Sequence, residues 1–535
     1  MSDETRDAGS GEGVAKPNPW KEITQPFVDV WHAPRALWGV NLSYMLEGLA
    51  YFGVLGYLAI YFSETVFAGL PNPDTIAHNM VMVLTAGITI AMLFLGFIPD
   101  KFGVRRALLW AFVLLVVGRT MIAAAPTVLN LQAGLWGPLH LATMAGILVV
   151  VVGYGMYQPA AYAAVRQFTT PTTSGMAYAM LYALMNLGGW FPTFAFLLRD
   201  EKFLGVGITG VFWFYVGITV LALVSTVFLL TSGTVRRAIE TAKADTAREH
   251  ATAVQAGGKP AEAAQGTSGS NPPFQMWLIA AALAVALWWK VPATPALFGL
   301  TLNVLLAVLA AVLWVALALA PPSGRFLARH PLADLKFFFF IFALIPVQTL
   351  FTYNWLVLPE YISRAFAGSP IGEYFEVAAN FNPILIFILA PVIAAATLKR
   401  KVYNMMIWGT FVMAAPTFLL AIGPYWWTLL AYLVIMTIGE AMWQPRFLQY
   451  AAEIAPEGRT GEYMGVAQLP WFLTKVLVPA LYSGWMMDRY CPAPETGRPV
   501  NTEPMWLIFG FIAMASFVLL VLAKNWIGKD FKTRA

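Results

Sequence analysis

Long apolar segments recur along the whole chain, separated by short polar loops. A membrane-spanning helix needs about 20 consecutive, mostly apolar residues. Fourteen segments come close to this requirement, near residues 36–62, 77–99, 107–125, 140–165, 174–198, 208–231, 274–290, 296–320, 337–358, 377–397, 403–422, 426–452, 462–486 and 504–523. We therefore predict an all-α polytopic membrane protein with 14 transmembrane helices, arranged as two six-helix bundles with an inserted pair between them.

The composition excludes a large soluble protein. Hydrophobic residues make up 59% of the 535 residues and charged residues only 11%, whereas a soluble domain carries about 25% charge. The formal net charge of +5 is modest, and basic residues in a membrane protein mostly report its orientation. We expect no nucleic-acid partner. The single cysteine, Cys491, cannot form a disulfide within the chain.

Lysine and arginine are distributed unevenly over the loops between these segments. With a cytoplasmic N-terminus, 20 of them fall in cytoplasmic loops and the C-terminal tail, and six fall on the opposite side. This bias has the direction of the positive-inside rule. Removing one span would invert every later loop and place Lys399, Arg400 and Lys401 outside. We therefore predict a multi-pass protein of the plasma (inner) membrane with both termini cytoplasmic.

Shifts in composition divide the chain into seven parts. The first 19 residues are polar and lack the apolar core of a signal peptide, and Trp20, Ile23, Phe27 and Trp31 follow at helical spacing. The expected parts are a cytoplasmic tail with an interfacial helix (1–34), an N-terminal six-helix bundle (35–231), a cytoplasmic linker starting with a short amphipathic helix (232–273), two inserted helices (274–320), a cytoplasmic loop (321–336), a C-terminal six-helix bundle (337–523) and a cytoplasmic tail (524–535).

Three ionisable residues lie deep in predicted spans, where a charge is costly and usually faces a cavity or a partner. Glu47 lies midway along the first span. Glu440 is about 14 residues from the outer end of its span and Lys475 about 13 residues from the inner end of its own, which places both roughly 20 Å into the membrane from opposite sides. We predict that these two form an intramembrane pair. All three are proton-coupling candidates, and a purely structural ion pair is the alternative for the two glutamates.

Aromatic and amide side chains recur at helical spacing in the same spans. The candidate substrate contacts are Tyr44, Tyr51, Tyr154, Gln158, Tyr182, Asn186, Asn382 and Trp443. Packing is the alternative for the tyrosines, and hydrogen bonding between helices is the alternative for the asparagines. We expect Arg119 and His140, near outer helix ends, to reach the membrane surface. We expect Arg446 to reach the inner surface or to anchor a neighbouring helix end.

The loop between the second and third spans carries a dense charge pattern. Residues 96–106 read GFIPDKFGVRR. The pattern G-x-x-x-D-[RK]-x-G-x-[RK]-[RK] resembles the loop signature of the major facilitator superfamily, although an ordinary basic inside loop is the alternative. The resemblance implies the major facilitator fold. It also implies a gating loop that holds the inner surface closed through charge and helix-end contacts, formed by Gly96, Asp100, Gly103, Arg105 and Arg106.

Further motifs resemble those of the proton-dependent oligopeptide transporter family, whose bacterial members also carry an additional helix pair. The matching runs are EGLAYFG at 47–53, GYGMYQP at 153–159, YALMNLG at 182–188, Asn382-Pro383 with Pro391, and TIGE at 437–440. The family's first-helix pattern E-x-x-E-R is incomplete here, because Tyr44 and Gly48 replace its first acid and its arginine, and Gln158 replaces its fourth-helix lysine. We hypothesise that Lys475 supplies the missing positive charge near Glu440.

The resemblance implies a secondary active transporter that moves a small organic solute, peptide-like or otherwise amphiphilic, by alternating access and with proton coupling. An uncoupled facilitator or exporter of the same fold is one alternative, and a non-transporting scaffold, sensor or assembly factor is another. We find no nucleophile–base pair, phosphate loop or metal cluster in a span, and we expect no enzyme activity, cofactor or metal. The expected partners are the solute, protons and the lipid bilayer, and the sequence leaves the oligomeric state open.

Overall fold

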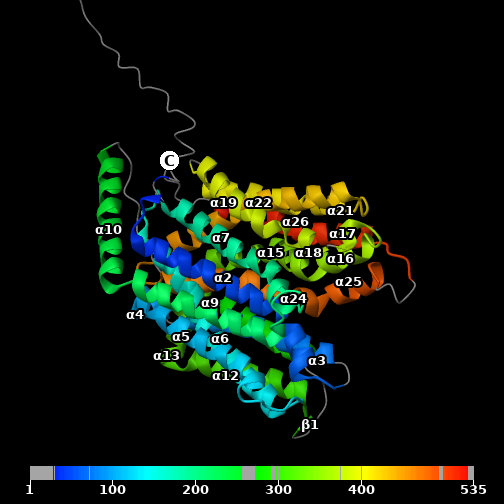
Figure 1. The fold of residues 1–535 in the computed structure, drawn as a ribbon. Coiled ribbons are helices and arrows are strands. Elements are labelled where there is room, and N and C mark those ends of the chain that lie inside the picture. Colours follow the sequence, from blue (N-terminus) through cyan, green and yellow to red (C-terminus); the bar gives the residue numbers. More distant parts are fainter. Residues whose placement is uncertain are drawn as a thin grey trace, which may run out of the picture.

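The computed structural model describes residues 28, 31–70, 73–255, 271–290, 296–297, 300–373, 375–398, 400–492 and 498–527. The expected interfacial helix at the N-terminus lies almost entirely outside these residues. The described chain is a bundle of long helices, with one two-stranded hairpin of β1 (Ala296–Leu297) and β2 (Leu300–Thr301). Figure 1 shows the helices running side by side.

The N-terminal bundle follows the first six apolar segments of the sequence. Its helices are α2 (Arg35–Tyr61) with the π-helical turn η1 (Phe62–Val66), α3 (Pro73–Leu95), α5 (Val104–Thr127), α6 (Pro138–Phe168), α7 (Ser174–Trp190) with η2 (Phe191–Phe194) and α8 (Phe196–Arg199), and α9 (Gly207–Leu229). The short helix α4 (Ile98–Phe102) lies in the charged loop. We call the end of the molecule that carries this loop the loop end.

The C-terminal bundle follows the last six apolar segments. Its helices are α14 (Leu335–Ala343), α15 (Ile345–Thr352), η4 (Tyr353–Val357) and α16 (Leu358–Ala365), then α17 (Pro370–Glu373), α18 (Phe375–Ala379) and α19 (Phe381–Ala396), then α20 (Val402–Ala414) and α21 (Thr417–Leu420), then α22 (Trp426–Glu453), then α23 (Thr460–Ala467), α24 (Leu469–Leu481) and α25 (Ser483–Tyr490), and finally α26 (Glu503–Leu522) and α27 (Lys524–Ile527). Prolines interrupt several of these spans because proline removes a backbone donor.

Four helices of the described chain, α10 to α13, lie between the two bundles. The helix α10 (Ser232–Gln255) is 24 residues long, which makes it longer than the short helix expected there. The inserted helices α11 (Phe274–Lys290) and α12 (Leu302–Leu319) pack against each other. The helix α13 (Pro321–Arg329) turns by 90° from α12 and leads through η3 (Pro331–Ala333) into the C-terminal bundle. Pro321 and Pro322 start this new helix, a position that proline favours.

Most of the predicted spans appear as long apolar helices in the described chain. Eleven helical segments of the described chain are long and apolar enough to cross a membrane, and the bent segment of α12 and α13 raises the number to 12. The described apolar parts of α3 (Met80–Leu95) and α11 (Phe274–Ala286) are shorter. These two shorter helices lie in the segments of two further predicted spans. The all-α polytopic fold class is confirmed.

The two bundles meet along a region that we call the seam. Across it α7 packs on α19, α3 packs on α24, and α6 packs on α23. Within the N-terminal bundle α2 and α7 approach so closely that a Cβ atom on Gly188 would lie 2.2 Å from the Met45 carbonyl oxygen. Such a contact tolerates only glycine, because the neighbour is backbone and cannot rotate away.

The substitution Gly188→Ala is therefore expected to separate α2 from α7 and to cost about 1–3 kcal/mol, the usual cost of overpacking. The measurement is the melting temperature of the purified protein in detergent. Gly217→Ala in α9 is the matched control, because nothing lies within 4 Å of the added methyl group. Equal melting temperatures for the two variants would contradict the close approach.

Candidate functional site

A buried ion pair joins three helices inside the N-terminal bundle. The Arg119 guanidinium donates to both carboxylate oxygens of Glu47, at 2.6 and 2.7 Å, and to the Thr219 hydroxyl at 2.5 Å. The Glu47 side chain is 0% exposed and that of Arg119 is 3% exposed. Two-point contact of this kind is the strongest geometry for a guanidinium and a carboxylate. The pair therefore ties α2, α5 and α9 together.

This geometry corrects the expectation for two residues at outer helix ends. Arg119 does not reach the membrane surface, because pairing with a buried carboxylate is more favourable than leaving that charge alone. His140 is also buried. Its Nδ1 accepts the Trp136 backbone N–H at 3.0 Å, and its ring lies against those of Trp136 and Phe67.

The tyrosines of α2 and α6 pack mainly on one another. Tyr44 stacks on Tyr157 at 5.5 Å and donates its hydroxyl proton to Tyr162 at 2.8 Å, and Tyr51 lies 4.7 Å from Tyr154. All five rings are buried. In this conformation Tyr44 and Tyr154 therefore pack against other rings, which is the alternative to a substrate contact given for the tyrosines. Tyr51 differs, because its hydroxyl is buried without a hydrogen-bond partner among the described residues.

Gln158 lies at the seam and contacts the other bundle. Its Nε2 donates to the Tyr44 hydroxyl at 3.3 Å and to Gln468 Oε1 at 3.4 Å. The other amide atoms, Gln158 Oε1 and Gln468 Nε2, are buried and have no partner within the described chain. Since nearly all buried polar atoms in proteins are hydrogen-bonded, an acceptor and a donor lie unused on opposite sides of the seam.

Glu440 is a carboxylate held from both bundles. Its Oε1 accepts the Tyr182 hydroxyl of α7 at 2.5 Å, and its Oε2 accepts Nδ2 of Asn382 of α19 at 2.8 Å. The same Asn382 amide donates to the Thr437 hydroxyl at 3.0 Å. Glu440 itself is 1% exposed. Two predicted candidates, Tyr182 and Asn382, thus converge on this carboxylate.

Lys475 is buried but has aromatic neighbours in place of an acid. Its Nζ lies 3.5 Å from the centre of the Trp471 ring, 5.1 Å from that of Phe472 and 5.7 Å from that of Tyr51 in the other bundle. Each contact has the geometry of a cation–π interaction. The ammonium group is therefore stabilised by ring faces at the seam.

The predicted ion pair between Glu440 and Lys475 is wrong for this conformation. Among the described residues neither side chain forms an ion pair with the other. The two residues lie on helices with different lateral neighbours. Lys475 is in α24, which packs against α15 and α3, whereas Glu440 is in α22, which packs against α19, α20 and α7. Equal depth in the membrane does not place two helices next to each other.

The other three side chains form hydrogen bonds to groups other than this carboxylate. Asn186 donates to the Tyr182 carbonyl of its own helix at 2.9 Å. Trp443 is buried inside the C-terminal bundle, where its indole N–H faces Met413 Sδ at 3.0 Å. Arg446 is buried and donates to the Ala394 carbonyl at 3.3 Å, so it anchors the end of α19, as one of its two alternatives predicted.

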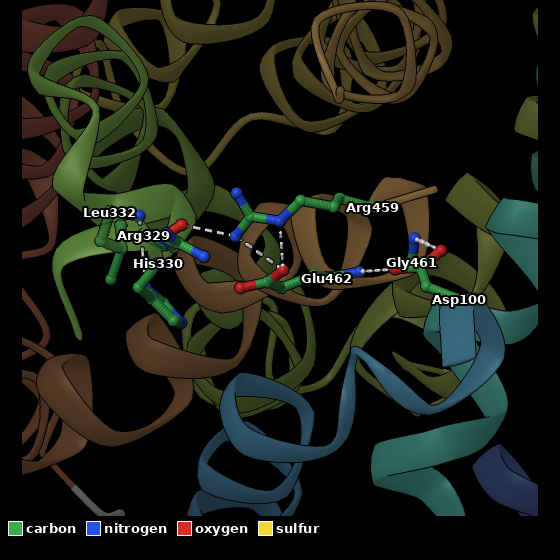
Figure 2. Close-up of polar contacts among 7 residues, drawn as sticks. All are labelled: Asp100, Arg329, His330, Leu332, Arg459, Gly461 and Glu462. Atoms are coloured by element: carbon green, nitrogen blue, oxygen red, sulfur yellow. Dashed lines mark hydrogen bonds and ion pairs between the residues drawn. The ribbon is translucent and has the colours of Figure 1, made fainter. Parts of the chain in front are cut away.

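Asp100 of the charged loop joins the two bundles (Figure 2). Its carboxylate oxygens accept the backbone N–H groups of Gly461 at 2.9 Å and of Glu462 at 3.0 Å. These N–H groups belong to the first turn of α23, where the helix supplies no acceptors of its own and the helix dipole favours an anion. A Cβ atom on Gly461 would lie 2.4 Å from the Pro99 ring. Glycine at 461 therefore permits the approach, and we call this contact the latch.

A second chain of contacts extends the latch to the segment after the inserted helices (Figure 2). Arg459 donates to Glu462 at 2.8 Å and to the Arg329 carbonyl at 2.5 Å. His330 is buried, and its Nδ1 accepts the Leu332 N–H at 3.3 Å. Burial lowers the pKa of His330 to about 4, so its ring is neutral at neutral pH. The entry to the C-terminal bundle is thus fixed beside the latch.

Sequence reasoning found one side of the latch and missed the other. Gly103 has a φ of +86°, the left-handed backbone that favours glycine, and Arg105 donates to the Leu230 carbonyl at 2.6 Å. Arg106 is exposed. The missed partners, Arg459, Gly461 and Glu462, carry a weak sequence signal. They form a short charged run with glycine at the start of a span.

Comparison with known proteins gives a fold and no family assignment. No family model and no curated protein matches this sequence. Solved structures do match in three dimensions. A peptide transporter POT in complex with sulfate aligns with a TM-score of 0.54 at 18% identity, covering 94% of this chain and 96% of that one. The proton:xylose symporter XylE aligns with a TM-score of 0.55 at 14% identity, covering 92% and 96%.

A further structural relative is the human organic anion transporter MFSD10 (TETRAN), with a TM-score of 0.52 at 14% identity, covering 91% of this chain and 99% of that one. These matches extend over nearly the whole membrane region. The chain therefore has the major facilitator fold, in agreement with the fold that the charged loop predicted.

The substitution Arg119→Gln is expected to destabilise the protein by about 3–5 kcal/mol, because it leaves Glu47 buried without its counter-charge. The double variant Glu47→Gln/Arg119→Gln is expected to recover part of this loss. The melting temperature in detergent is the measurement. Arg248→Gln, which breaks an exposed ion pair, is the control and should cost less than about 1 kcal/mol. A single variant as stable as its control would contradict the pairing.

Acidification is expected to favour the closed latch. Burial raises the pKa of Asp100 to about 6 from 3.8, while the N–H groups of Gly461 and Glu462 and the charge of Arg459 lower it and the charge of Glu462 raises it. In an open latch Asp100 is in water, where its pKa returns toward 3.8. The closed state therefore binds the proton more tightly, and its population should rise as pH falls from about 6 to about 4.

The measurement is the distance between spin labels on cysteines at positions 101 and 457, both exposed, as a function of pH. Asp100→Asn should remove the dependence in this range. A closed population that falls on acidification would contradict the assignment. The same curve in Asp100→Asn would assign the effect to Glu462, the other acid at the latch.

Proposed function

We propose that this protein is a secondary transporter that moves a small organic solute by alternating access. In this proposal the bundles at 35–231 and 337–523 rock against each other about the seam, and the latch holds the loop end closed. The excess of basic residues favours a cytoplasmic position for the loop end. The present structure would then be the state that is closed on the cytoplasmic side.

The observation that carries the proposal is the position of Glu440. This buried carboxylate accepts one hydrogen bond from each bundle, from Tyr182 on one side and Asn382 on the other. Separation of the bundles would remove the Tyr182 bond and admit water. Because both solvation and hydrogen bonding set the proton affinity of a carboxyl group, its protonation would differ between the two states. Rocking and proton binding would thereby be coupled.

The proposed proton site is Glu440, with Lys475 as a second charge that opening of the seam would hydrate. Glu47 is assigned to the fixed pair with Arg119, which favours a structural role inside one bundle. If Glu440 were equally accessible in both states, the same fold would act as an uncoupled facilitator. The buried ion pair between Glu47 and Arg119 is the observation that favours the uncoupled facilitator as a second candidate function.

The proposed solute is polar and amide-bearing or amphiphilic. Support comes from the unused acceptor Gln158 Oε1 and the unused donor Gln468 Nε2 on facing sides of the seam, and from the unpaired Tyr51 hydroxyl, as judged within the described chain. A solute entering between the bundles would meet these groups together with aromatic ring faces. Peptide-like solutes agree with this chemistry. The likeness to peptide transporter structures at 16–18% identity points the same way.

The test has two stages with purified protein. A melting-temperature screen of di- and tripeptides, amino acids, nucleosides and organic anions at two pH values identifies a ligand, because binding stabilises the folded carrier. Proteoliposomes then report solute flux and solute-induced pH change. If no ligand stabilises the protein, no solute flux is measured and protein partners copurify stably, the results would point to a non-transporting scaffold.

With a ligand in hand, Glu440→Gln is expected to retain solute binding and to lose solute-induced proton movement, about tenfold or more, since a titrating carboxyl becomes a fixed amide. Lys475→Met is expected to lower flux independently. The two side chains do not pair in this conformation. The losses of solute flux caused by the two substitutions, expressed as free energies, should therefore add in the double variant. Rescue of Lys475→Met by Glu440→Gln would instead restore the paired hypothesis for another conformation. Unchanged proton movement in Glu440→Gln would assign the proton to another group, whereas solute flux without proton movement in the unmodified protein would leave the uncoupled facilitator.

A further inference from the structure

A pocket of about 460 Å³ opens at the loop end between the charged loop and α10. Four basic residues and one acid line it, namely Arg105, Arg106, Arg236, Lys243 and Glu240. Its remaining lining includes the apolar side chains of Phe102, Val235 and Ile239. The charged positions of the pocket are therefore mainly basic, and several of its other positions are apolar. The seam and the latch do not use it.

The helix α10 gives this pocket its position relative to the membrane. In Figure 1 α10 lies at the left edge and runs across the direction of α2 and α9. It packs on α6 and α2 through the buried residues Val235, Ala238 and Ala242. Near its other end Glu249 accepts the Thr172 hydroxyl at 2.5 Å. Since α2 and α9 cross the membrane, a helix laid across their ends lies along its surface.

The bases of the pocket differ in how far they are engaged. Arg105 is partly buried and holds the Leu230 carbonyl. Arg236 pairs with Glu240 at 2.8 Å, and both side chains are mostly exposed, at 80% and 61%. An exposed pair of this kind is worth little, so Arg236 can exchange partners. Arg106 and Lys243 are exposed. The pocket thus offers a cationic rim without a matching number of acids.

An apolar surface leads from the pocket to the lipid-facing side of the bundle. Phe102 is 38% exposed and Trp110 on α5 is 45% exposed, and their rings lie 5.3 Å apart. Exposed aromatic rings near a span end are typical of the interface between headgroups and acyl chains. The cationic rim and this aromatic pair are adjacent, as the two parts of a phospholipid are.

We propose that this pocket binds an anionic phospholipid of the leaflet on the loop side. The phosphate and headgroup lie among Arg106, Arg236 and Lys243, and an acyl chain runs along Phe102 and Trp110. The occupant is a lipid rather than a free anion, because a free phosphate would leave the apolar wall unused. Bound lipid would tie α10 and the charged loop together on one side of the latch.

The test uses the purified full-length protein in detergent, with added phosphatidylglycerol or phosphatidylcholine of the same chains. Melting temperature and native mass spectrometry report binding. Phosphatidylglycerol is expected to stabilise the protein more and to be retained. The variant Arg236→Gln/Lys243→Gln is expected to weaken its apparent affinity about fivefold or more. Lys243→Gln alone should shift it in the same direction.

The matched control is Arg237→Gln/Arg248→Gln, which removes the same charge from the same helix, away from the pocket, and also breaks one exposed ion pair. It should leave the affinity unchanged. Equal weakening in both double variants, or no preference for phosphatidylglycerol in the unmodified protein, would overturn the proposal. Equal stabilisation by soluble inorganic phosphate or glycerol 3-phosphate would also overturn it, in favour of a free-anion site. None of these readouts depends on solute transport.

Discussion

A charged side chain inside this bundle is held only where other groups replace the water that it loses, and this requirement shapes the interior. Removing a charge from water costs several kcal/mol unless hydrogen bonds or a counter-charge replace the solvent. Arg119 and Glu47 satisfy each other and bring α2, α5 and α9 into one unit. Glu440 is satisfied by neutral donors, and Lys475 by ring faces. The contacts of Glu47 and Glu440 also fix which helices are neighbours.

The ion pair and the weaker polar contacts lie in different parts of the molecule. The strong two-point ion pair lies within one bundle. Away from the latch, the polar contacts described across the seam are single hydrogen bonds and a cation–π contact, from Tyr182, Gln158 and Tyr51. A net hydrogen bond is worth about 1 kcal/mol, or about 1.5–3 kcal/mol when it goes to a charged group, so each of these contacts can be exchanged for water at a modest cost. In the proposed transport cycle, each bundle would stay intact while the seam between them opens. That distribution is what a rocking transporter requires.

At the loop end the backbone itself stabilises a charge. Asp100 binds the free N–H groups at the start of α23 and needs no basic side chain to do so. The basic residues of the same loop make other contacts. Arg105 holds the end of α9 through Leu230, and Arg106 faces the pocket beneath α10. One loop therefore serves the contact between the bundles and the surface that faces the lipid headgroups.

The sequence by itself determined the class of fold. The length of an apolar segment sets whether it can span the bilayer, the basicity of its flanking loops sets its orientation, and both are local properties of the sequence. It also determined depth, since a rise of about 1.5 Å per residue converts position in a span into height in the membrane. It did not determine lateral neighbours. Glu440 and Lys475 share a depth and yet do not pair, while Arg119, assigned to the surface, turns inward to Glu47. Only the tertiary structure decided these partners, because the packing of helices around the bundle is set by contacts between segments far apart in the chain.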